Sequence, residues 1–212
     1  MQQTGSVVRD SVNWWDFGSV LVYTPPKTGT TTLMEQFPHL RRTYPIPRNQ
    51  KIIGGFRNPV TRWISAYNQL IVQRGKAVMK EKPLLDHFGS AWFDHWFPDT
   101  ITDPIGHARR FLLEAQPEIE SVGLELHFCS QSLCYRRLLG EGWRSHDQLQ
   151  LIDYSEWLPT INRIAQVNIL EPGNVGVYQS VPKHYYNTLY PLLEQVFEED
   201  LEHWHSININ TV

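Results

Sequence analysis

The stretch GSVLVYTPPKTGTTTLMEQF, residues 18–37, decides the expected fold. Its first part, 18–26, is a short apolar run that ends in two prolines, a pattern typical of a buried strand that stops abruptly. The second part, 27–37, predicts a turn followed by a helix, because Gly29 gives the turn conformational freedom and apolar residues then recur at helical spacing. A strand that leads through a turn into a helix is the first half of a parallel α/β unit.

The second half of that unit begins with KIIGGF, residues 51–56, which predicts another buried strand. Asn58 follows as the expected helix N-cap and Pro59 as the first helical residue, and the helix is expected to run to about Arg74. The apolar stripe on its core face comprises Trp63, Ile64, Tyr67, Leu70 and Ile71. This order of elements predicts an α/β fold, a three-layer sandwich with a central parallel sheet.

Weaker patterns extend the prediction toward both ends of the chain. Further strands are expected at 121–128 and 149–154. Helical or irregular structure is expected at 83–115, a helix with Ser155 as N-cap at 155–166, and two short C-terminal helices interrupted by Pro191 at 184–204. Residues 1–17 are expected to form a lead-in whose Trp14, Trp15 and Phe17 pack on the domain. No Ser/Gly-rich linker divides the chain, so a single domain over residues 1–212 is expected.

Composition supports a folded chain with one cationic region. The 212 residues are 41% apolar and include 26 aromatic residues, which excludes disordered, collagen-like and coiled-coil proteins. The net charge is −3, but residues 27–82 contain 11 Lys and Arg against two acids and carry +9, while the rest carries −12. The overall charge argues against a nucleic-acid partner, whereas the cationic third predicts an anionic ligand.

The chain has two cysteines, Cys129 and Cys134, which form neither a disulfide framework nor a zinc site. The N-terminal residues lack the basic and apolar regions of a signal peptide, and no apolar run reaches the roughly 20 residues of a membrane span. These features predict a soluble, cytoplasmic protein with reduced thiols and no bound metal.

The turn after the first strand has the composition of an anion-binding loop. Lys27 supplies charge, and a helix start supplies free backbone N–H groups and a positive dipole end. The expected ligands of a phosphate-like group are Pro26, Lys27, Thr28, Gly29, Thr30, Thr31 and Thr32. A nucleotide-kinase loop would place its Lys after the glycines, whereas Lys27 precedes the one Gly of this loop. The alternative is an ordinary strand-to-helix turn that is capped by threonines.

A second anion-binding pattern follows the second strand. Arg57 stands at the carboxyl end of that strand, and Ser65 lies two turns along the next helix. Arg offers a bidentate donor for a phosphate and Ser adds a hydroxyl. Because ligands of parallel sheets bind at the carboxyl ends of the strands, Lys27 and Arg57 together predict a ligand with two separated anionic groups.

These two motifs resemble those of the sulfotransferases. PPKTGTTTL resembles their 5′-phosphosulfate loop, and GGFRNPVTRWISAY resembles their 3′-phosphate motif, R-x-P-x-x-R-x-x-S-x-Y; the similarity covers about residues 18–70. The resemblance implies a P-loop NTPase-like sulfotransferase fold with 18–70 as the donor-binding core. It also implies the donor 3′-phosphoadenosine 5′-phosphosulfate (PAPS), the product 3′-phosphoadenosine 5′-phosphate (PAP) and no metal.

A third segment is similar to carbohydrate sulfotransferases. LHFCSQSLC, residues 126–134, and LQLIDYSEWLPTI match their H-[FW]-x-x-Q-x-x-x-C and D-x-x-x-E-x-[LW] segments at His127, Phe128, Gln131, Cys134, Asp153, Glu156 and Trp157. The resemblance implies that 126–134 flanks the nucleotide or the acceptor cleft, that 83–145 is an acceptor-side insertion, and that the acceptor is a carbohydrate or another small hydroxyl compound. Lys183 is expected to cover the nucleotide.

Transfer to a hydroxyl or amine needs a general base. His39 is the first candidate, because Pro38-His39-Leu40 is similar to the segment that carries the catalytic His of cytosolic sulfotransferases; Glu35 is the second and His127 the third. Trp92, Phe93, Trp96 and Phe97 could line an acceptor cleft or fill the core, and Arg41, Arg42 and Arg48 could bind an anionic acceptor or remain solvated. The competing functions are a non-catalytic module that binds sulfated glycans or other anions, and a P-loop nucleotide kinase.

Overall fold

The computed structural model describes residues 13–43, 49–73, 83–124, 126–167 and 183–209. The strands are β1 (Asn13–Asp16), β2 (Val20–Tyr23), β3 (Arg41–Thr43), β4 (Lys51–Phe56) and β5 (Leu149–Asp153). The helices are α1 (Thr30–Gln36), α2 (Pro59–Tyr67), α4 (Pro83–Phe88), α5 (Ser90–Trp96), α6 (Pro104–Arg110), α7 (Gln116–Val122), α8 (Gln131–Leu139), α9 (Tyr154–Ala165), α10 (Tyr190–Val196) and α11 (Glu198–Ile209). Short 3-10 helices are η2 (Pro38–Leu40), η5 (Trp143–Ser145) and η6 (Lys183–Leu189), and π-helices are η3 (Asn68–Gln73) and η4 (Phe111–Ala115).

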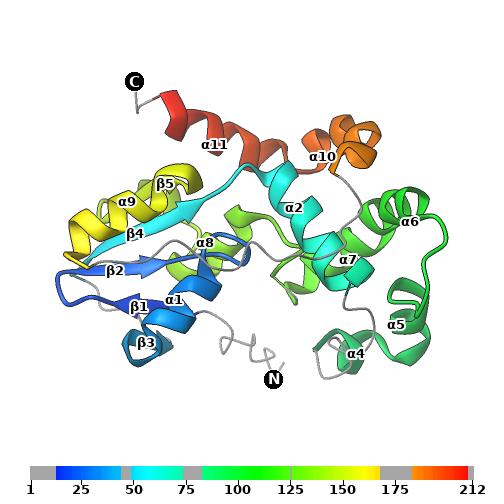
Figure 1. Cartoon of the computed structure of the whole chain (residues 1–212), viewed down its shortest axis with the longest axis horizontal. Coiled ribbons are helices and arrows are strands. Elements are labelled where there is room, and N and C mark those ends of the chain that lie inside the picture. Colours follow the sequence, from blue (N-terminus) through cyan, green and yellow to red (C-terminus); the bar gives the residue numbers. More distant parts are fainter. Residues whose placement is uncertain (1–12, 44–48, 74–82, 125, 168–182, 210–212) are drawn as a thin grey trace, which may run out of the picture. The chain divides into compact units, whose positions relative to one another are not determined.

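The fold class is α/β, with a five-stranded sheet in the order β3-β1-β2-β4-β5 (Figure 1). β2, β4 and β5 are parallel, as the sequence predicts. The expected all-parallel sheet is wrong, because β1 pairs antiparallel with both β2 and β3. The two missed strands are only four and three residues long, and the first lies in the segment expected to be a lead-in.

The chain groups into two compact units: Met1–Phe56 with Cys134–Pro172, and Arg57–Leu133 with Gly173–Val212. The first unit contains the sheet together with α1, η2, η5 and α9. The second unit contains α2, the helices from α4 to α7, α10 and α11. The single domain expected over 1–212, with 83–145 as an acceptor-side insertion, stays a prediction.

In the first unit, helical residues cover both faces of the sheet. On one face, Val22 and Ile53 pack with Leu33 of α1 and with Trp157 and Ile161 of α9. On the other face, the Tyr135 ring of α8 lies 5.2 Å from the Tyr23 ring and 6.0 Å from the Phe56 ring. The alternation of side chains along β2 and β4 therefore supplies both layers of the core.

Two glycines of β4 allow these aromatic rings to approach the strand. A Cβ on Gly54 would lie 2.4 Å from the Tyr135 hydroxyl, and a Cβ on Gly55 would lie 3.0 Å from Cδ1 of Trp157. The Tyr135 hydroxyl donates a hydrogen bond to the main-chain oxygen of Gly55 at 2.8 Å. The Gly54-Gly55 pair is therefore a packing requirement of the strand rather than a flexible hinge.

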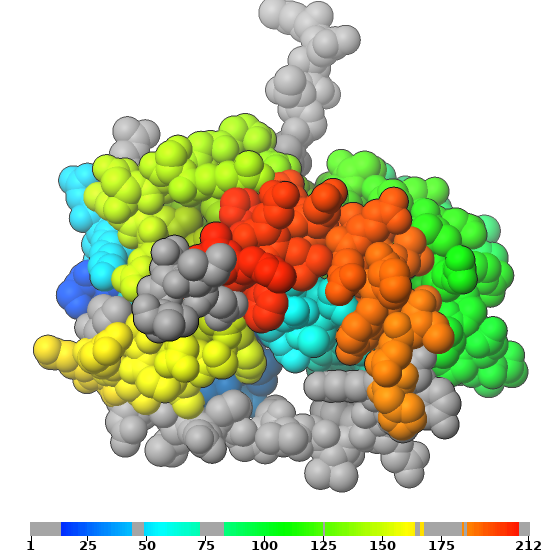
Figure 2. Space-filling view, turned by 90° about the horizontal axis from the view of Figure 1, so that it is seen from above, coloured from blue at the N-terminus to red at the C-terminus, as the bar shows by residue number. Residues whose placement is uncertain are grey.

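The second unit is built around α2, which begins as predicted. The Asn58 side chain accepts a hydrogen bond from the N–H of Thr61 at 3.1 Å, and Pro59 is the first helical residue. The predicted stripe is buried throughout: Trp63, Ile64, Tyr67, Leu70 and Ile71. Figure 2 shows α10 and α11 against the cyan α2 helix, where Leu193 and Phe197 are buried.

Three local predictions are corrected. The strand expected at 121–128 does not form in its described residues, because α7 extends to Val122, Gly123 ends it with a left-handed φ of 61°, and residues 126–128 form turns. The cap of α9 is Asp153 rather than Ser155, since the Asp153 carboxylate accepts from the N–H of Ser155 at 2.9 Å. Pro191 stands in the first turn of α10, where proline is tolerated, instead of interrupting a helix.

Replacing Gly54 with Ala is expected to lower the free energy of unfolding by about 2 kcal/mol, because the new methyl group must displace the Tyr135 ring. Urea denaturation measures the change. Gly142→Ala is the matched control, since no atom lies within 4 Å of its added Cβ and its φ of −81° suits any residue. Equal effects of the two variants would contradict the packing requirement at β4.

A buried histidine makes the second unit sensitive to acid. His107 Nδ1 lies 2.7 Å from the hydroxyl of Tyr67, and that hydroxyl donates to the main-chain oxygen of Pro104 at 3.2 Å. Burial, followed by the positive charges of Arg110 and His95, lowers the pKa of His107 to about 4; Asp103 acts in the opposite direction. The neutral imidazole is therefore the form that the folded chain accommodates.

Stability is expected to fall as the pH drops from about 6.5 to 4, because only the unfolded chain protonates His107 in that window. His107→Gln removes this dependence, worth on the order of 1 kcal/mol between pH 7 and pH 5. Urea midpoints measured across this pH range test the prediction, with exposed His87→Gln as the control. A wild-type slope that survives in His107→Gln would assign the acid sensitivity to another group.

Candidate functional site

The loop between β2 and α1 turns sharply at Lys27 and Gly29. Lys27 has a φ of 69° and Gly29 a φ of 100°, both in the left-handed region. For a residue with a Cβ this conformation is uncommon and costs about 1 kcal/mol or more. Thr28 between them is fully buried, and its N–H closes the turn by donating to the oxygen of Pro25 at 3.1 Å. A strained lysine in a tightly closed loop fits a functional constraint on its position.

The hydroxyl groups of the loop support its own backbone. The Thr28 hydroxyl donates to the oxygen of Pro25. The Thr30 hydroxyl lies 3.1 Å from the Thr24 hydroxyl, 3.1 Å from the Thr24 oxygen and 3.2 Å from the Pro25 oxygen. Thr28 and Thr30 therefore hold the loop in shape, and their predicted contact with a donor stays a prediction.

The backbone at the start of α1 provides the donors for an anion. The first helical hydrogen bond runs from the N–H of Leu33 to the oxygen of Gly29 at 3.3 Å. The N–H groups of Thr30, Thr31 and Thr32 precede that bond, and no side chain caps the helix. Such N–H groups, together with the positive end of the helix dipole and a nearby Lys, can bind a phosphate or sulfate group.

Trp157 packs against this loop, a structural role that the sequence motifs did not predict. Its six-membered ring would be 3.2 Å from a Cβ on Gly29, and its five-membered ring 3.0 Å from a Cβ on Gly55. The indole is therefore enclosed between the loop and β4, and only 3% of Trp157 is exposed. Its position three residues after Tyr154, the first residue of α9, and the glycines at 29 and 55 were the signals that the sequence offered.

The two candidate bases of the first unit are both exposed. His39 lies on η2, with its ring 6.5 Å from the ring of Phe37. Glu35 is the penultimate residue of α1. Arg42 Nη1 donates to the main-chain oxygen of His39 at 2.8 Å, so the turn that carries His39 is tied to β3.

The second predicted anion motif belongs to the second unit. Arg57 follows β4 directly, Asn58 caps α2, and Ser65 is half-buried within that helix. The side-chain amide of Gln131 pairs with both main-chain groups of Arg57: Nε2 donates to the Arg57 oxygen at 2.7 Å, and the Arg57 N–H donates to Oε1 at 3.0 Å. The backbone from which the Arg57 side chain departs is thus fixed by a residue 74 positions away.

Arg62, the second arginine of the same motif, is fully buried. Its guanidinium donates to the main-chain oxygens of Leu126, His127 and Cys129. Within the described residues it therefore holds the turn at 126–129. Cys129 and Cys134 are both buried, and neither is part of a disulfide.

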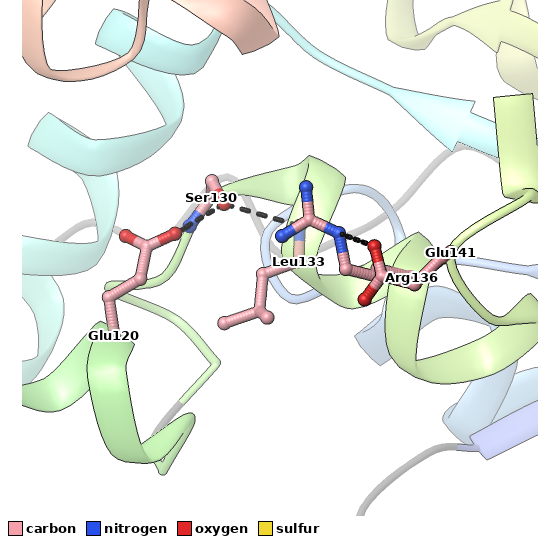
Figure 3. A network of polar contacts seen from close by, with 5 residues as sticks. All are labelled: Glu120, Ser130, Leu133, Arg136 and Glu141. Carbon is pink, nitrogen blue, oxygen red and sulfur yellow. Dashed lines mark hydrogen bonds and ion pairs between the residues drawn. The ribbon is translucent and has the colours of Figure 1, made fainter.

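The N–H groups in the first turn of α8 donate hydrogen bonds to the side chains of Asp200 and Ser130. Asp200, fully buried on α11, accepts from the N–H of Gln131 at 2.6 Å and from the N–H and hydroxyl of Ser132 at 2.8 and 2.6 Å. Figure 3 shows Glu120 accepting from Ser130, whose hydroxyl in turn accepts from the N–H of Leu133 at 3.2 Å. In the first unit, the same figure shows the ion pair between Arg136 and Glu141 at 3.1 Å.

Other predicted site residues lie apart from these clusters or outside the described residues. Phe93, Trp96 and Phe97 are buried and fill the core of the second unit, whereas Trp92 is half-buried and its indole donates to Glu118 at 2.5 Å. Arg41 and Arg42 are exposed on β3, and Arg48 lies outside the described residues. Lys183 begins η6, but its side chain also lies outside them.

Among the helices of the described ranges, none combines the length and the apolar character needed to cross a bilayer. Comparisons of the chain with protein-family models, with curated proteins and with solved structures found no match. Function is therefore inferred from the residues and their geometry.

Lys27→Gly is expected to be more stable than Lys27→Ala by about 1 kcal/mol, because glycine adopts a φ of 69° without a steric penalty. Both variants lack the ammonium group, so their difference isolates the backbone strain. The free energy of unfolding in urea measures it. At Lys51, an exposed strand residue, the Ala variant should be the more stable one, and the same order at both positions would exclude strain at Lys27.

Proposed function

We propose that this chain is a PAPS-dependent sulfotransferase that moves a sulfuryl group to a hydroxyl or amine acceptor, with a carbohydrate as the acceptor class that its motifs suggest. The observation that supports it most is the loop after β2. A left-handed Lys27 there stands beside the N–H groups of Thr30, Thr31 and Thr32. On this proposal the chain has a P-loop NTPase-like sulfotransferase fold.

The loop would hold the 5′-phosphosulfate end of the donor. Backbone N–H groups would bind its oxygens, and Lys27 would neutralise the charge that develops on the departing 5′-phosphate oxygen. Arg57 and Ser65 would bind the 3′-phosphate, and Lys183 would cover the nucleotide. The positive end of α1 and the fork of an arginine suit the two anionic groups of PAPS.

The transfer is an in-line displacement at sulfur. The acceptor oxygen or nitrogen forms a bond to sulfur while the bond from sulfur to the bridging oxygen of the 5′-phosphate breaks. The acceptor proton passes to a base, and PAP leaves with the electron pair of the broken bond. His39 is the proposed base and Glu35 the second candidate, since both are exposed residues of the segment that follows the loop.

Titration calorimetry with PAP and transfer of labelled sulfate from PAPS test this function. Wild-type protein should bind PAP without added metal and label a member of a broad glycan, phenol and peptide panel. Lys27→Ala should lower transfer at least about 100-fold, because it removes a donor at the leaving oxygen. Arg57→Ala should raise the Kd for PAP about 10- to 100-fold, because it removes a charged hydrogen bond.

Two substitutions provide matched controls. Lys51→Ala removes an exposed lysine from the first residue of β4, at the opposite end of the strand from the loop, and Arg109→Ala removes an exposed arginine from α6. Neither should change PAP binding or transfer. Tight ATP–Mg²⁺ binding without PAP binding would instead favour a nucleotide kinase, and PAP binding without transfer to any acceptor would favour a binding module.

A further inference from the structure

We propose that Gln131 is a positioning residue that presents Arg57 to the 3′-phosphate, an inference that rests on the proposed function. Its basis is the double hydrogen bond between the Gln131 amide and the main chain of Arg57. A side-chain amide that bonds both the N–H and the oxygen of one residue imitates strand pairing. It fixes the backbone dihedral angles of that residue and so the direction in which its side chain leaves.

Burial makes this pairing obligatory. Gln131 has no exposed surface, so water cannot replace the two bonds if the amide moves away. A buried main-chain group without a partner is costly, and the two groups of Arg57 have the amide as their partner. Gln131 and Arg57 are therefore expected to keep one relative arrangement in the free protein.

Gln131 is itself anchored by groups that leave little freedom at its backbone. Its N–H donates to the fully buried Asp200 carboxylate at 2.6 Å, and Ser132 donates twice to the same carboxylate. On the other side, Ser130 is held by Glu120 and caps the helix (Figure 3). The first turn of α8 is thus a fixed platform from which the Gln131 amide reaches Arg57.

A fixed Arg57 backbone has a consequence for ligand binding. Arginine loses conformational entropy when it clamps a phosphate, and a preset backbone reduces that loss. The benefit applies only to ligands that carry the group that Arg57 binds. Loss of Gln131 should therefore weaken the binding of a nucleotide with a 3′-phosphate more than the binding of one without it, whereas a general loss of stability would weaken both.

The experiment compares PAP with adenosine 5′-phosphate, which lacks the 3′-phosphate, by titration calorimetry of the full chain. Gln131→Met retains the side-chain length but removes both bonds, and should raise the Kd for PAP about tenfold while the Kd for adenosine 5′-phosphate stays within about twofold. Gln131→Glu is the second variant: its carboxylate can accept from the Arg57 N–H but cannot donate to the Arg57 oxygen, so an intermediate effect is expected.

Gln116→Met is the matched control. Gln116 is also a buried glutamine of this unit; it accepts from the Trp63 indole at 3.1 Å and donates to Glu120 at 2.9 Å. Its loss should change stability without changing the ratio of the two nucleotide affinities. An unchanged ratio in Gln131→Met would overturn the inference.

Hydrogen exchange separates this inference from the proposed function. The Arg57 amide should be protected in the wild type and should exchange at least tenfold faster in Gln131→Met, whatever the ligand. Equal protection in both proteins would overturn the positioning role even if PAP binds. Absence of PAP binding by a wild type that shows the exchange difference would count against the sulfotransferase function alone.

Discussion

Gly54 and Gly55 let β4 accept an aromatic ring on each face, and the first unit depends on this close approach. Tyr135 occupies the space beside Gly54, and Trp157 the space beside Gly55. Trp157 also lies against Gly29, so one indole joins the central strand to the candidate anion loop. The position of the loop is therefore set by packing in the core, and the strained backbone at Lys27 is sustained by a rigid support.

The two candidate anion motifs obtain their rigidity in different ways. The loop after β2 is held by bonds among neighbours, since Thr28 and Thr30 both bond to carbonyls within six residues. The motif after β4 relies on Gln131 and, through it, on Asp200. The first arrangement can be read from a short sequence window, whereas the second requires three distant segments to meet.

This difference explains what the sequence could predict. β2, β4, β5 and the cap of α2 follow from apolar runs and from Asn58-Pro59, and all were predicted. β1 and β3 are too short to show a periodic pattern, and without them the sheet was expected to be parallel throughout. The prediction of a strand at 121–128 was wrong, because apolar composition alone does not reveal that a helix ends at Gly123.

The candidate site was predictable to a similar extent. The location of the anion loop could be predicted from its residues. The direction of its hydroxyl groups could not, because only the folded turn brings the Pro25 oxygen within reach of Thr28 and Thr30. Among the described residues, two of the arginines that contribute to the +9 charge of 27–82 bond to main chain: Arg62 is fully buried against carbonyls, and Arg42 uses one guanidinium nitrogen to bond the oxygens of His39 and Arg41. Some of the positively charged side chains therefore stabilise the main chain. On β3, Arg42 stabilises the turn that carries His39, the proposed base.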